Sequence, residues 1–412
     1  MIILTLNCGS SSVKYCIFNT KNSEMLCSGI VGRIGLQGSF IRHKVNSKTI
    51  HHEIECQNHS DAIKDIQLML ISPTNGVLKK ISEVDAVGHR VVHGGEEFRD
   101  SILIDKNVEE TIKALFHLAP LHNPPNLMGI QSAKELLPDV PHVAIFDTTF
   151  HNTIPNYAFR YAIPTEWYSR FKIRRYGFHG TSHKFVSQRA IELLGNDPKG
   201  TKIITLHLGN GSSATAVKDG HSIDTSMGMT PLEGLVMGTR SGDIDPAAIL
   251  FMLRSKDTSP GEVDDILNRK SGFLGITQTM SDVKDVEDAA NEGNELAQLA
   301  LKIASYRLSK YVGSYTASLG GLDAIVFTAG IGENSPTFRK MVIDQLSFLG
   351  VKLDEKANDI AFGGKKEVCI TQKESKVKVF VIPTNEELMM ARDVERIVLE
   401  SETGEVSVIE AE

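Results

Sequence analysis

The sequence predicts an α/β protein in which two duplicated domains flank one ligand cleft. Two stretches carry this prediction, residues 2–18 (IILTLNCGSSSVKYCIF) and residues 202–217 (KIITLHLGNGSSATAV). Each has an apolar, β-prone run, a turn rich in glycine and serine, and a second run, which is the pattern of a β-hairpin. Gly-Ser-Ser stands at the corresponding place in both turns. Because each hairpin opens about half of the chain, the repetition indicates duplicated domains.

Both turns have the chemistry of an anion site. Residues 7–12 supply a glycine, three serine hydroxyls and closely spaced backbone N–H groups, and Lys14 adds a positive charge just beyond them. Such a turn can wrap an anion. One serine-rich hairpin alone would more simply be an ordinary turn. The occurrence of two favours a phosphate chain held between them.

Bulk composition excludes several classes of protein. The chain has 412 residues, which exceeds the size at which a single core stops growing, so we expect at least two domains. The net charge of -7 argues against nonspecific nucleic-acid binding. We find neither a signal-peptide pattern nor an uncharged stretch of membrane-span length, and we expect no membrane association. Five cysteines without CxxC spacing indicate reduced thiols and a cytoplasmic location.

In the first half of the chain, two charged residues at strand ends are site candidates. We expect strands in 24–58, a helix over 60–71 capped by Ser60, a buried strand over 84–92, a proline-rich connection over 118–126, a helix over 127–137 and a strand over 141–146. Arg90 lies in an apolar strand beside a Gly-Gly turn, where an unpaired buried arginine would be costly. We therefore expect it to face an oxyanion. Asp147 ends a buried strand, a common place for site chemistry in α/β folds, although a cap is nearly as good an explanation.

An aromatic, irregular region over 151–180 ends in the segment RRYGFHGTSH. His179 and His183 are four residues apart, but no glutamate follows His179, so the zinc pattern HExxH is absent. A histidine just before a helix N-terminus is better suited to meet an anion. We expect Thr181 or Ser182 to cap the helix that follows.

In the second half, glycine-rich loops are the site candidates. Residues 225–246 form a long loop that carries Arg240, and loops of this length are usually functional. Helices are expected in 246–319, including a long amphipathic one over 295–319. A strand over 322–328 leads into a glycine turn that lacks the third glycine of GxGxxG and suits close approach to one nucleotide. The last helix follows a strand over 379–382. Glu386 or Glu387 at its start would hold magnesium through water or complement the helix dipole.

Taken together, these segments resemble the acetate kinase (acetokinase) family, within the actin, Hsp70 and sugar kinase superfamily. The resemblance covers nearly the whole chain, and its motifs stand in family order: NCGSSSVKY, GHRVVHGG, LHNPPNL, FDTTFH, RRYGFHGTSH, HLGNGSS, MTPLEGLVMGTRSGDIDP, TAGIGENS and PTNEEL. Pro125 is a small departure, since alanine is expected there. The resemblance implies two actin-like ATPase domains with a ribonuclease H-like fold. The first would span 1–147 and be completed by 387–412, and the second would span 148–386.

The resemblance also implies roles for individual residues. Arg90 and Arg240 would bind the acyl carboxylate and the phosphoryl group, His179 would stabilise the transition state, and Asp147 is the family's assigned acid/base residue. Asn7 and Glu386 would organise the metal ion. A small apolar pocket for the methyl group would consist of Val92, Leu121, Phe178 and Pro231. The nucleotide would be bound by Lys14, His207, Leu208, Gly209, Asn210, Gly211, Asp282, Val283, Lys284, Gly330, Ile331, Gly332, Glu333 and Asn334.

The implied reaction is the reversible, direct in-line transfer of the γ-phosphoryl group of ATP to acetate, giving acetyl phosphate and ADP. It would need Mg²⁺, for which Mn²⁺ can substitute, and the resemblance implies a homodimer formed through the helical second half. With a pKa of about 4, acetate is ionised at neutral pH and needs no general base. We therefore hypothesise that Asp147 orients His179 or Arg240. Two alternatives are a kinase for propionate or butyrate, and an ATP-dependent chaperone or filament protein on the same fold.

Overall fold

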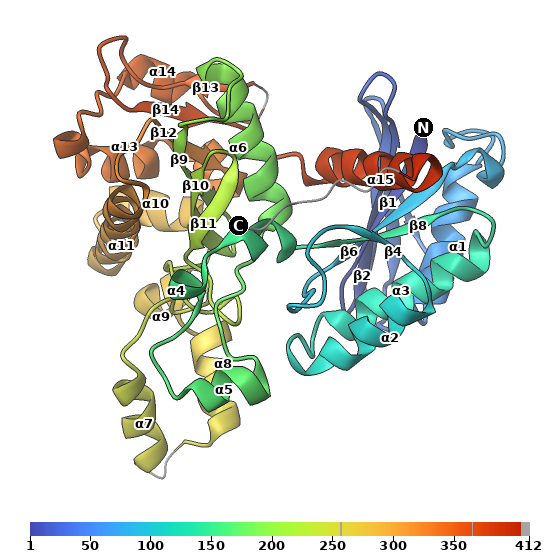
Figure 1. The fold of residues 1–412 in the computed structure, drawn as a ribbon, viewed down its shortest axis with the longest axis horizontal. Coiled ribbons are helices and arrows are strands. Elements are labelled where there is room, and N and C mark those ends of the chain that lie inside the picture. Colours follow the sequence, from blue (N-terminus) through green and yellow to red (C-terminus); the bar gives the residue numbers. More distant parts are fainter. Residues whose placement is uncertain (256–257, 365, 405–412) are drawn as a thin grey trace. The chain divides into compact units, whose positions relative to one another are not determined.

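The computed structural model describes residues 1–255, 258–364 and 366–404, and the chain divides into two compact units. Of the described residues, unit 1 comprises 1–149 together with 385–404, and unit 2 comprises those between 150 and 384. The C-terminal helix α15 (Glu386–Thr403) therefore belongs with the N-terminal strands, although the whole of unit 2 separates them in sequence (Figure 1). The end of the chain beyond residue 404, which includes part of the expected 387–412 segment, lies outside the described residues.

Unit 1 is built on an eight-stranded mixed sheet in the order β5-β4-β3-β2-β1-β6-β8-β7. The predicted first hairpin is confirmed: β1 pairs antiparallel with β2, and Gly9 N donates to Ser12 O at 2.8 Å across the turn. On its other side β1 pairs parallel with β6, and β6 pairs parallel with β8. The strands are β1 (Ile2–Cys8), β2 (Ser12–Asn19), β3 (Glu24–Gly32), β4 (Phe40–Val45), β5 (Lys48–Glu53), β6 (Ala86–Val91), β7 (Ile102–Leu103) and β8 (His142–Phe146).

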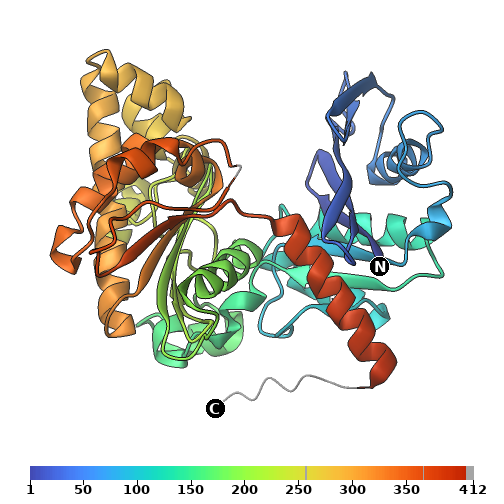
Figure 2. The ribbon, with the colours of Figure 1, turned by 90° about the horizontal axis from the view of Figure 1, so that it is seen from above.

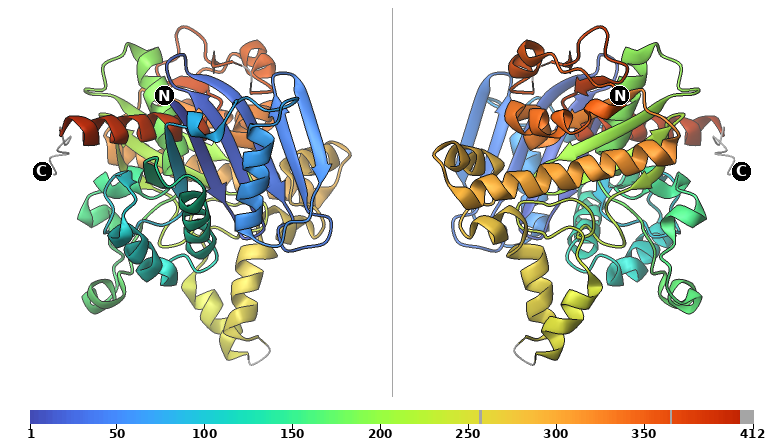
Figure 3. Two further views of the ribbon diagram at one scale, coloured as in Figure 1. Left: turned by 90° about the vertical axis from the view of Figure 1, so that its right-hand side faces the viewer. Right: turned by 90° about the vertical axis from the view of Figure 1, so that its left-hand side faces the viewer.

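Helices cover this sheet on both faces. Successive side chains of a strand point to opposite faces, and β1 follows this rule. Leu4 and Leu6 join the core under α1 (His59–Leu70) and α3 (Asn123–Leu136), while Ile3 joins the core under α15 (Figures 2 and 3). The remaining helical segments of this unit are α2 (Lys106–Ala114), η1 (Ile81–Glu83) and η2 (Leu115–His117), and η3 (Thr149–Thr153) begins at its end.

Two helices of unit 1 start earlier than the sequence pattern predicts. The N-cap of α1 is Asn58 rather than Ser60, because the Asn58 side chain accepts a hydrogen bond from Asp61 N at 3.0 Å. Helix α3 begins at Asn123 and takes the two prolines into its first turn. Proline is tolerated there because the first N–H groups of a helix have no partner within the helix. The proline-rich connection is therefore shorter than expected.

Unit 2 repeats the topology of unit 1. Its six-stranded sheet has the order β11-β10-β9-β12-β14-β13. The predicted second hairpin is confirmed as the antiparallel pair β9–β10, and β9 pairs parallel with β12 as β1 does with β6. The segment β11-β10-β9-β12-β14 thus matches β3-β2-β1-β6-β8 in order and direction. The strands are β9 (Lys202–Leu208), β10 (Ser212–Lys218), β11 (His221–Thr225), β12 (Ala324–Thr328), β13 (Val368–Cys369) and β14 (Lys378–Val381).

Two long helices cover opposite faces of this second sheet. The predicted helix α11 (Glu295–Leu319) lies across one face, where it packs against Ile204 and Leu206 of β9 (Figure 3). Helix α6 (Gly180–Leu194) packs on the other face, toward which Thr205 and His207 point. The other helical elements are α4 (Asn156–Phe159), α5 (Thr165–Phe171), α7 (Pro246–Arg254), α8 (Pro260–Arg269), α9 (Gly272–Thr277), α10 (Val283–Asn291), α12 (Ala329–Asn334), α13 (Pro336–Asp344), η4 (Ser347–Leu349) and α14 (Glu355–Ile360).

The loop predicted over 225–246 is present, since residues 226–245 form neither helix nor strand. Helix α7 begins at Pro246, the last residue of that range. Across the described residues, none of the helices combines the length and the apolar character that crossing a membrane requires.

Candidate active site

In unit 1, Arg90 is held between two predicted site residues. Arg90 lies near the C-terminal end of β6, and Asp147 follows β8, its parallel neighbour, so both stand at the same edge of the sheet. Arg90 Nε donates to Asp147 Oδ1 at 2.8 Å, and Arg90 Nη2 bonds to Asp147 Oδ2. Arg90 Nη1 donates to Asn7 Oδ1 at 3.3 Å. Residues from β1 and from the ends of β6 and β8 therefore form one cluster.

The carboxylate of Asp147 is fully engaged by this arginine. Only 2% of Asp147 is exposed, and each of its oxygens accepts from Arg90, a fork that suits a guanidinium. Burial by itself would lower the pKa of Arg90, but the adjacent Asp147 charge outweighs it and raises that pKa above its ordinary value. The sequence-based hypothesis named His179 or Arg240 as the group that Asp147 orients. Within unit 1 the Asp147 carboxylate orients Arg90, a partner that this hypothesis did not name.

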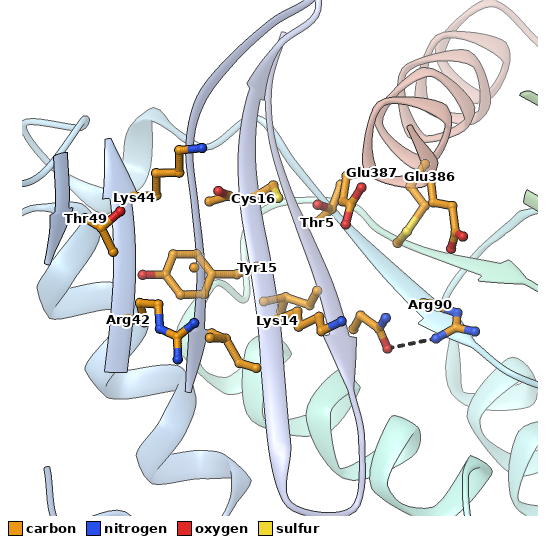
Figure 4. Close-up of a pocket in the computed structure, with 16 residues that line it drawn as sticks. Thr5, Lys14, Tyr15, Cys16, Arg42, Lys44, Thr49, Arg90, Glu386 and Glu387 are labelled. Carbon is orange, nitrogen blue, oxygen red and sulfur yellow. Dashed lines mark hydrogen bonds between the residues drawn. The ribbon is translucent and has the colours of Figure 1, made fainter. Parts of the chain in front are cut away.

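A pocket of about 530 Å³ opens beside this cluster, on the face of the sheet that carries α15. Lys14 of β2, Arg90, and Glu386 and Glu387 of α15 line it, together with Asn7 (Figure 4). The carboxylates are brought there by the start of the helix, which Asn385 caps by accepting from Leu388 N at 3.0 Å. Cations and carboxylates thus share one polar pocket within unit 1.

Glu386 has an unusual protonation equilibrium in this pocket. Loss of hydration raises its pKa to about 7, although the nearby Arg90 charge acts in the opposite direction. Asn7 and Glu386 offer oxygen atoms, the ligand type that Mg²⁺ prefers, and Mg²⁺ sites commonly use one or two carboxylates plus water and substrate phosphates. Within the described ranges, three or more His, Cys, Asp or Glu side chains nowhere gather into a ready metal site. The donor set therefore fits a metal ion shared with a phosphate ligand.

An asparagine that the sequence analysis did not single out fixes the strand ends in unit 1. Val92 N donates to Asn126 Oδ1 at 3.0 Å, and Asn126 Nδ2 donates to Cys8 O at 2.6 Å. Asn126 lies in the first turn of α3, so it ties the end of β6 to the end of β1. Its place directly after two prolines was the available sequence signal, and the structure shows it to be buried. Leu121, by contrast, is 62% exposed.

In unit 2, His179 stands at the start of α6 in a left-handed conformation, with φ of 57°. Its Nδ1 lies 2.8 Å from Ser213 Oγ, and its ring stacks on His207 at 4.1 Å between centroids. The expectation that Thr181 or Ser182 caps α6 is wrong, since both lie inside the helix and His179 occupies the cap position without a side-chain cap bond. The contacts of His179 with β9 and β10 explain its place there.

Arg240 and His179 come together at Gly211. A Cβ added to Gly211 would lie 3.2 Å from Arg240 Nη1 and 3.4 Å from His179 Nε2, so a side chain would crowd both. Arg240 Nη1 also donates to Pro231 O at 3.3 Å. Burial lowers the pKa of Arg240, and no ion pair to it occurs among the residues that the structure describes. A half-buried cation without a carboxylate partner is suited to receive an anion.

The loop that bears Arg240 is anchored by Arg175. Arg175 Nη1 donates to Thr225 O at 2.7 Å and Ser226 O at 3.1 Å, and Arg175 Nη2 bonds to Glu233 Oε1 at 2.6 Å. Phe178, three residues further, is buried at 3% exposure. This anchoring role of Arg175 could not be predicted from the sequence, because its partners lie about fifty residues away along the chain.

Local hydrogen bonds hold two of the predicted nucleotide segments of unit 2, the β9–β10 turn and the start of α10. Asn210 O accepts from Gly238 N at 3.2 Å in the β9–β10 turn, beside His207, Leu208 and Gly209. Asp282 caps α10 by accepting from Lys284 N at 2.8 Å, and Val283 is buried. The Asp282 carboxylate therefore has a structural role whatever else it does.

The segment after β12 is a helix rather than the expected glycine turn. Ala329, with φ of 64°, opens α12, which contains Gly330, Ile331, Gly332, Glu333 and Asn334. Glu333 Oε1 accepts from Ala329 N at 2.8 Å and Thr384 N at 3.1 Å. Apart from its chain neighbours and the backbone of α12 itself, none of the described residues has an atom within 4 Å of a Cβ built on Gly330, which leaves room for a ligand to approach the backbone.

Comparison with known proteins decides the family. Residues 2–392 match the model of the acetokinase family. The chain belongs to the acetokinase family. Over 398 residues it is 53% identical to the acetate kinase of Pseudothermotoga lettingae, covering 97% of this chain and 98% of that protein. The acetate kinase of Thermotoga maritima is likewise 53% identical over 399 residues, covering 97% and 99%.

Solved acetokinase structures share this fold. The acetate kinase of Porphyromonas gingivalis is 44% identical with a TM-score of 0.93, covering 96% of this chain and 99% of that one. A propionate kinase of Francisella tularensis is 43% identical with a TM-score of 0.89 and the same coverage. The predicted α/β fold is confirmed, since the structure has two mixed sheets and is consistent with a two-domain actin-like ATPase. Acetokinase membership also removes the chaperone and filament alternative.

Proposed function

We propose that this member of the acetokinase family is an acetate kinase, which reversibly transfers the γ-phosphoryl group of ATP to acetate in a direct, magnesium-dependent reaction. The observation that carries the proposal is its 53% identity, over 97% of the chain, to relatives named acetate kinase. The cationic side chains of the two units support it, because the reaction must bring the acetate carboxylate close to the negatively charged phosphates of ATP.

Two arginines reduce that repulsion. Arg90 is oriented by Asp147 and Asn7, and its remaining N–H groups are available to an oxyanion. Arg240 lacks a carboxylate partner among the described residues, and it lies beside His179 at Gly211. Donors fixed before the reaction stabilise the charge that spreads over the phosphoryl oxygens. In this proposal one guanidinium binds the acyl carboxylate, and both contact the phosphoryl group as it moves.

Asp147 acts as an orienting residue in this mechanism. Acetate has a pKa of about 4 and is already a carboxylate at neutral pH, so no proton has to be removed from the nucleophile. Both Asp147 oxygens already accept hydrogen bonds from Arg90. Asp147 therefore fixes the plane of that guanidinium and keeps it charged.

Asn7 and Glu386 would hold the magnesium ion, with Glu386 in its ionised form. When bound, Mg²⁺ neutralises charge on the β- and γ-phosphate oxygens. Lys14 lies in the same pocket and would contact the phosphates as a mobile cation. The backbone segments around Asn210 and Gly330 would receive the rest of the nucleotide.

Propionate is the second candidate acceptor, because a relative named propionate kinase shares 43% identity and a TM-score of 0.89. Val92, Leu121, Phe178 and Pro231 would contact the acyl chain. One methylene changes binding by only about 1–3 kcal/mol, so we expect acetate to be preferred and propionate to be a slower substrate. We further propose a cytoplasmic homodimer, which sedimentation would test.

The deciding experiment is a hydroxamate assay for acyl phosphate with ATP, Mg²⁺ and either acid. We expect acetyl hydroxamate to form, and its yield to exceed that of propionyl hydroxamate at equal concentration. No acyl hydroxamate with either acid would overturn the proposal. A clear preference for propionate would move the assignment to the second candidate.

A further inference from the structure

A chain of short hydrogen bonds runs beneath α6 from the middle of β9 to His179. Thr205 Oγ1 lies 2.7 Å from His183 Nδ1, and His183 Nε2 lies 2.7 Å from Ser213 Oγ. Ser213 Oγ lies 2.8 Å from His179 Nδ1. Thr205, His183 and Ser213 are each 0% exposed. Because these groups have no exposed surface, the position of every hydrogen is set by the neighbouring group.

The buried end of the chain decides its direction. A hydroxyl has one hydrogen to donate, and a neutral imidazole has one N–H. Burial lowers the pKa of His183 well below its ordinary value, so this ring is neutral. Among the described residues, the Thr205 hydroxyl forms its side-chain hydrogen bond with His183. If Thr205 accepted a hydrogen from His183, its own hydrogen would be buried without an acceptor, which disfavours that arrangement by about tenfold or more.

The remaining hydrogens follow in sequence. Thr205 donates to His183 Nδ1, so the proton of His183 is on Nε2 and is donated to Ser213 Oγ. Ser213 must then donate its own hydrogen to His179 Nδ1. That nitrogen is an acceptor, and the proton of a neutral His179 is left on Nε2.

We propose that this chain fixes His179 as the Nε2–H tautomer, so that a neutral imidazole presents an N–H donor to the phosphoryl group in transit. The inference rests on the proposed function and assigns Thr205, His183 and Ser213 as positioning residues. His179 Nε2 is the atom next to Gly211, on the side where Arg240 Nη1 lies. The guanidinium supplies the fixed charge there.

The opposite tautomer would be harmful. With its proton on Nδ1, His179 would turn the lone pair of Nε2 toward the phosphoryl oxygens. A donor in the right place stabilises developing charge, whereas a lone pair repels it. A neutral donor also keeps working as the pH rises above the pKa of histidine, which an imidazolium does not.

Long-range ¹H–¹⁵N correlation spectra of full-length protein labelled with ¹⁵N-histidine test the tautomer directly, with His179→Gln to assign the signal. We expect His179 to carry its proton on Nε2 at pH 7.5. Ser213→Ala should remove the bias, as should Thr205→Val, which keeps the shape but not the hydroxyl. Thr205→Ser should retain it. A proton on Nδ1, an imidazolium in the wild type, or a tautomer unchanged in Ser213→Ala would overturn the inference.

A matched control is Ser222→Ala, which removes a buried serine–histidine bond of the same kind, 2.9 Å from His151 Nδ1, and removes no hydrogen bond of the chain, although the His151 ring packs edge-on against His183. It should lower the melting temperature but leave the tautomer of His179 unchanged. A shift in the His179 tautomer here as large as that in Ser213→Ala would also count against us, because it would show a general packing effect.

Kinetics supply an independent readout. Ser213→Ala should lower kcat about tenfold with nearly unchanged KM values. His179→Gln, whose amide reaches the Nε2 position, should retain more activity than His179→Asn, whose amide does not. Equal loss in both variants, or a wild-type kcat that falls above pH 7, would contradict a neutral Nε2–H donor. The spectra do not depend on turnover, so an inactive protein with the expected tautomer would remove only the proposed function.

Discussion

Replacing Asp147 by asparagine separates the orienting role of this residue from acid/base catalysis. The substitution keeps the size of the side chain but leaves one oxygen to accept from Arg90 where the wild type has two. The lost interaction is one charge-assisted hydrogen bond, either that of Nε at 2.8 Å or the bond of Nη2 to the second oxygen. Such a bond contributes about 2 kcal/mol. If its loss is expressed in the transition state, kcat falls about thirtyfold.

The assay is the dependence of kcat and kcat/KM on pH for the wild type and Asp147→Asn, followed by coupled detection of ADP. We expect the curves to have the same shape and to differ only in height. Asp147→Glu is the matched control, since it keeps the charge and changes only the reach. An ionisation present in the wild type and absent from Asp147→Asn would refute the orienting role and restore the acid/base assignment.

Three further perturbations test other parts of the account. Arg90→Ala should lower kcat by about a hundredfold or more as well as raising KM for acetate, because guanidinium contacts tighten in the transition state; a change in KM alone would make Arg90 a plain binding residue. Gly211→Ala should lower kcat several-fold with little change in melting temperature, because its Cβ would lie 3.2 Å from Arg240 Nη1. An unchanged kcat would show that Arg240 can move away from the added methyl group without loss of activity. Burial lowers the pKa of His151 to about 4, so between about pH 6.5 and pH 4 the unfolded chain binds a proton at this residue that the folded chain does not. The free energy of unfolding should therefore fall as the pH drops through this range, by at most about 3 kcal/mol for this residue. Denaturant titrations at several pH values should show a shallower fall in His151→Gln, and an equal fall in both proteins would contradict it.

Sequence patterns predicted the parts of the fold that depend on local periodicity. Both hairpins, the long helix α11 and the loop over 226–245 were readable because each is a contiguous run with its own turn or capping signals. The starts of α1, α3 and α6 were less readable. The start of α6 depends on contacts of His179 with β10, a segment more than thirty residues away, which no local rule contains.

The pairing of Arg90 with Asp147 shows why candidate residues were easier to name than their partners. Each residue stood out alone, as a charge at the end of an apolar strand. Their contact depends on the parallel register of β6 and β8, in which Val91 lies opposite Phe146. The two residues are 57 positions apart in the chain, so no local pattern joined them, and the sequence analysis named His179 or Arg240 as the group that Asp147 orients without considering Arg90.

The two hairpins show how one scaffold acquired two different site chemistries. Thr5 of β1 and Thr205 of β9 occupy corresponding positions, each on the strand face that a helix covers, α15 in unit 1 and α6 in unit 2. Two residues further on, the same face carries Asn7 in one unit and His207 in the other.

In unit 1 that position accepts from Arg90, and the pocket is left open beside the acidic start of α15. In unit 2 it stacks on His179, and α6 supplies His183 to close a buried chain that ends at Ser213. The difference follows from what the covering helix brings. Carboxylates suit a metal ion that phosphate oxygens would share, whereas the buried imidazole of His183 suits an aligned hydrogen-bond chain. Exchanging Asn7 for histidine should therefore not create a second His179-like site, because the buried hydroxyl–imidazole bond of unit 1, between Tyr15 and His43, lies on the other face of the sheet and cannot set the tautomer of a ring at position 7.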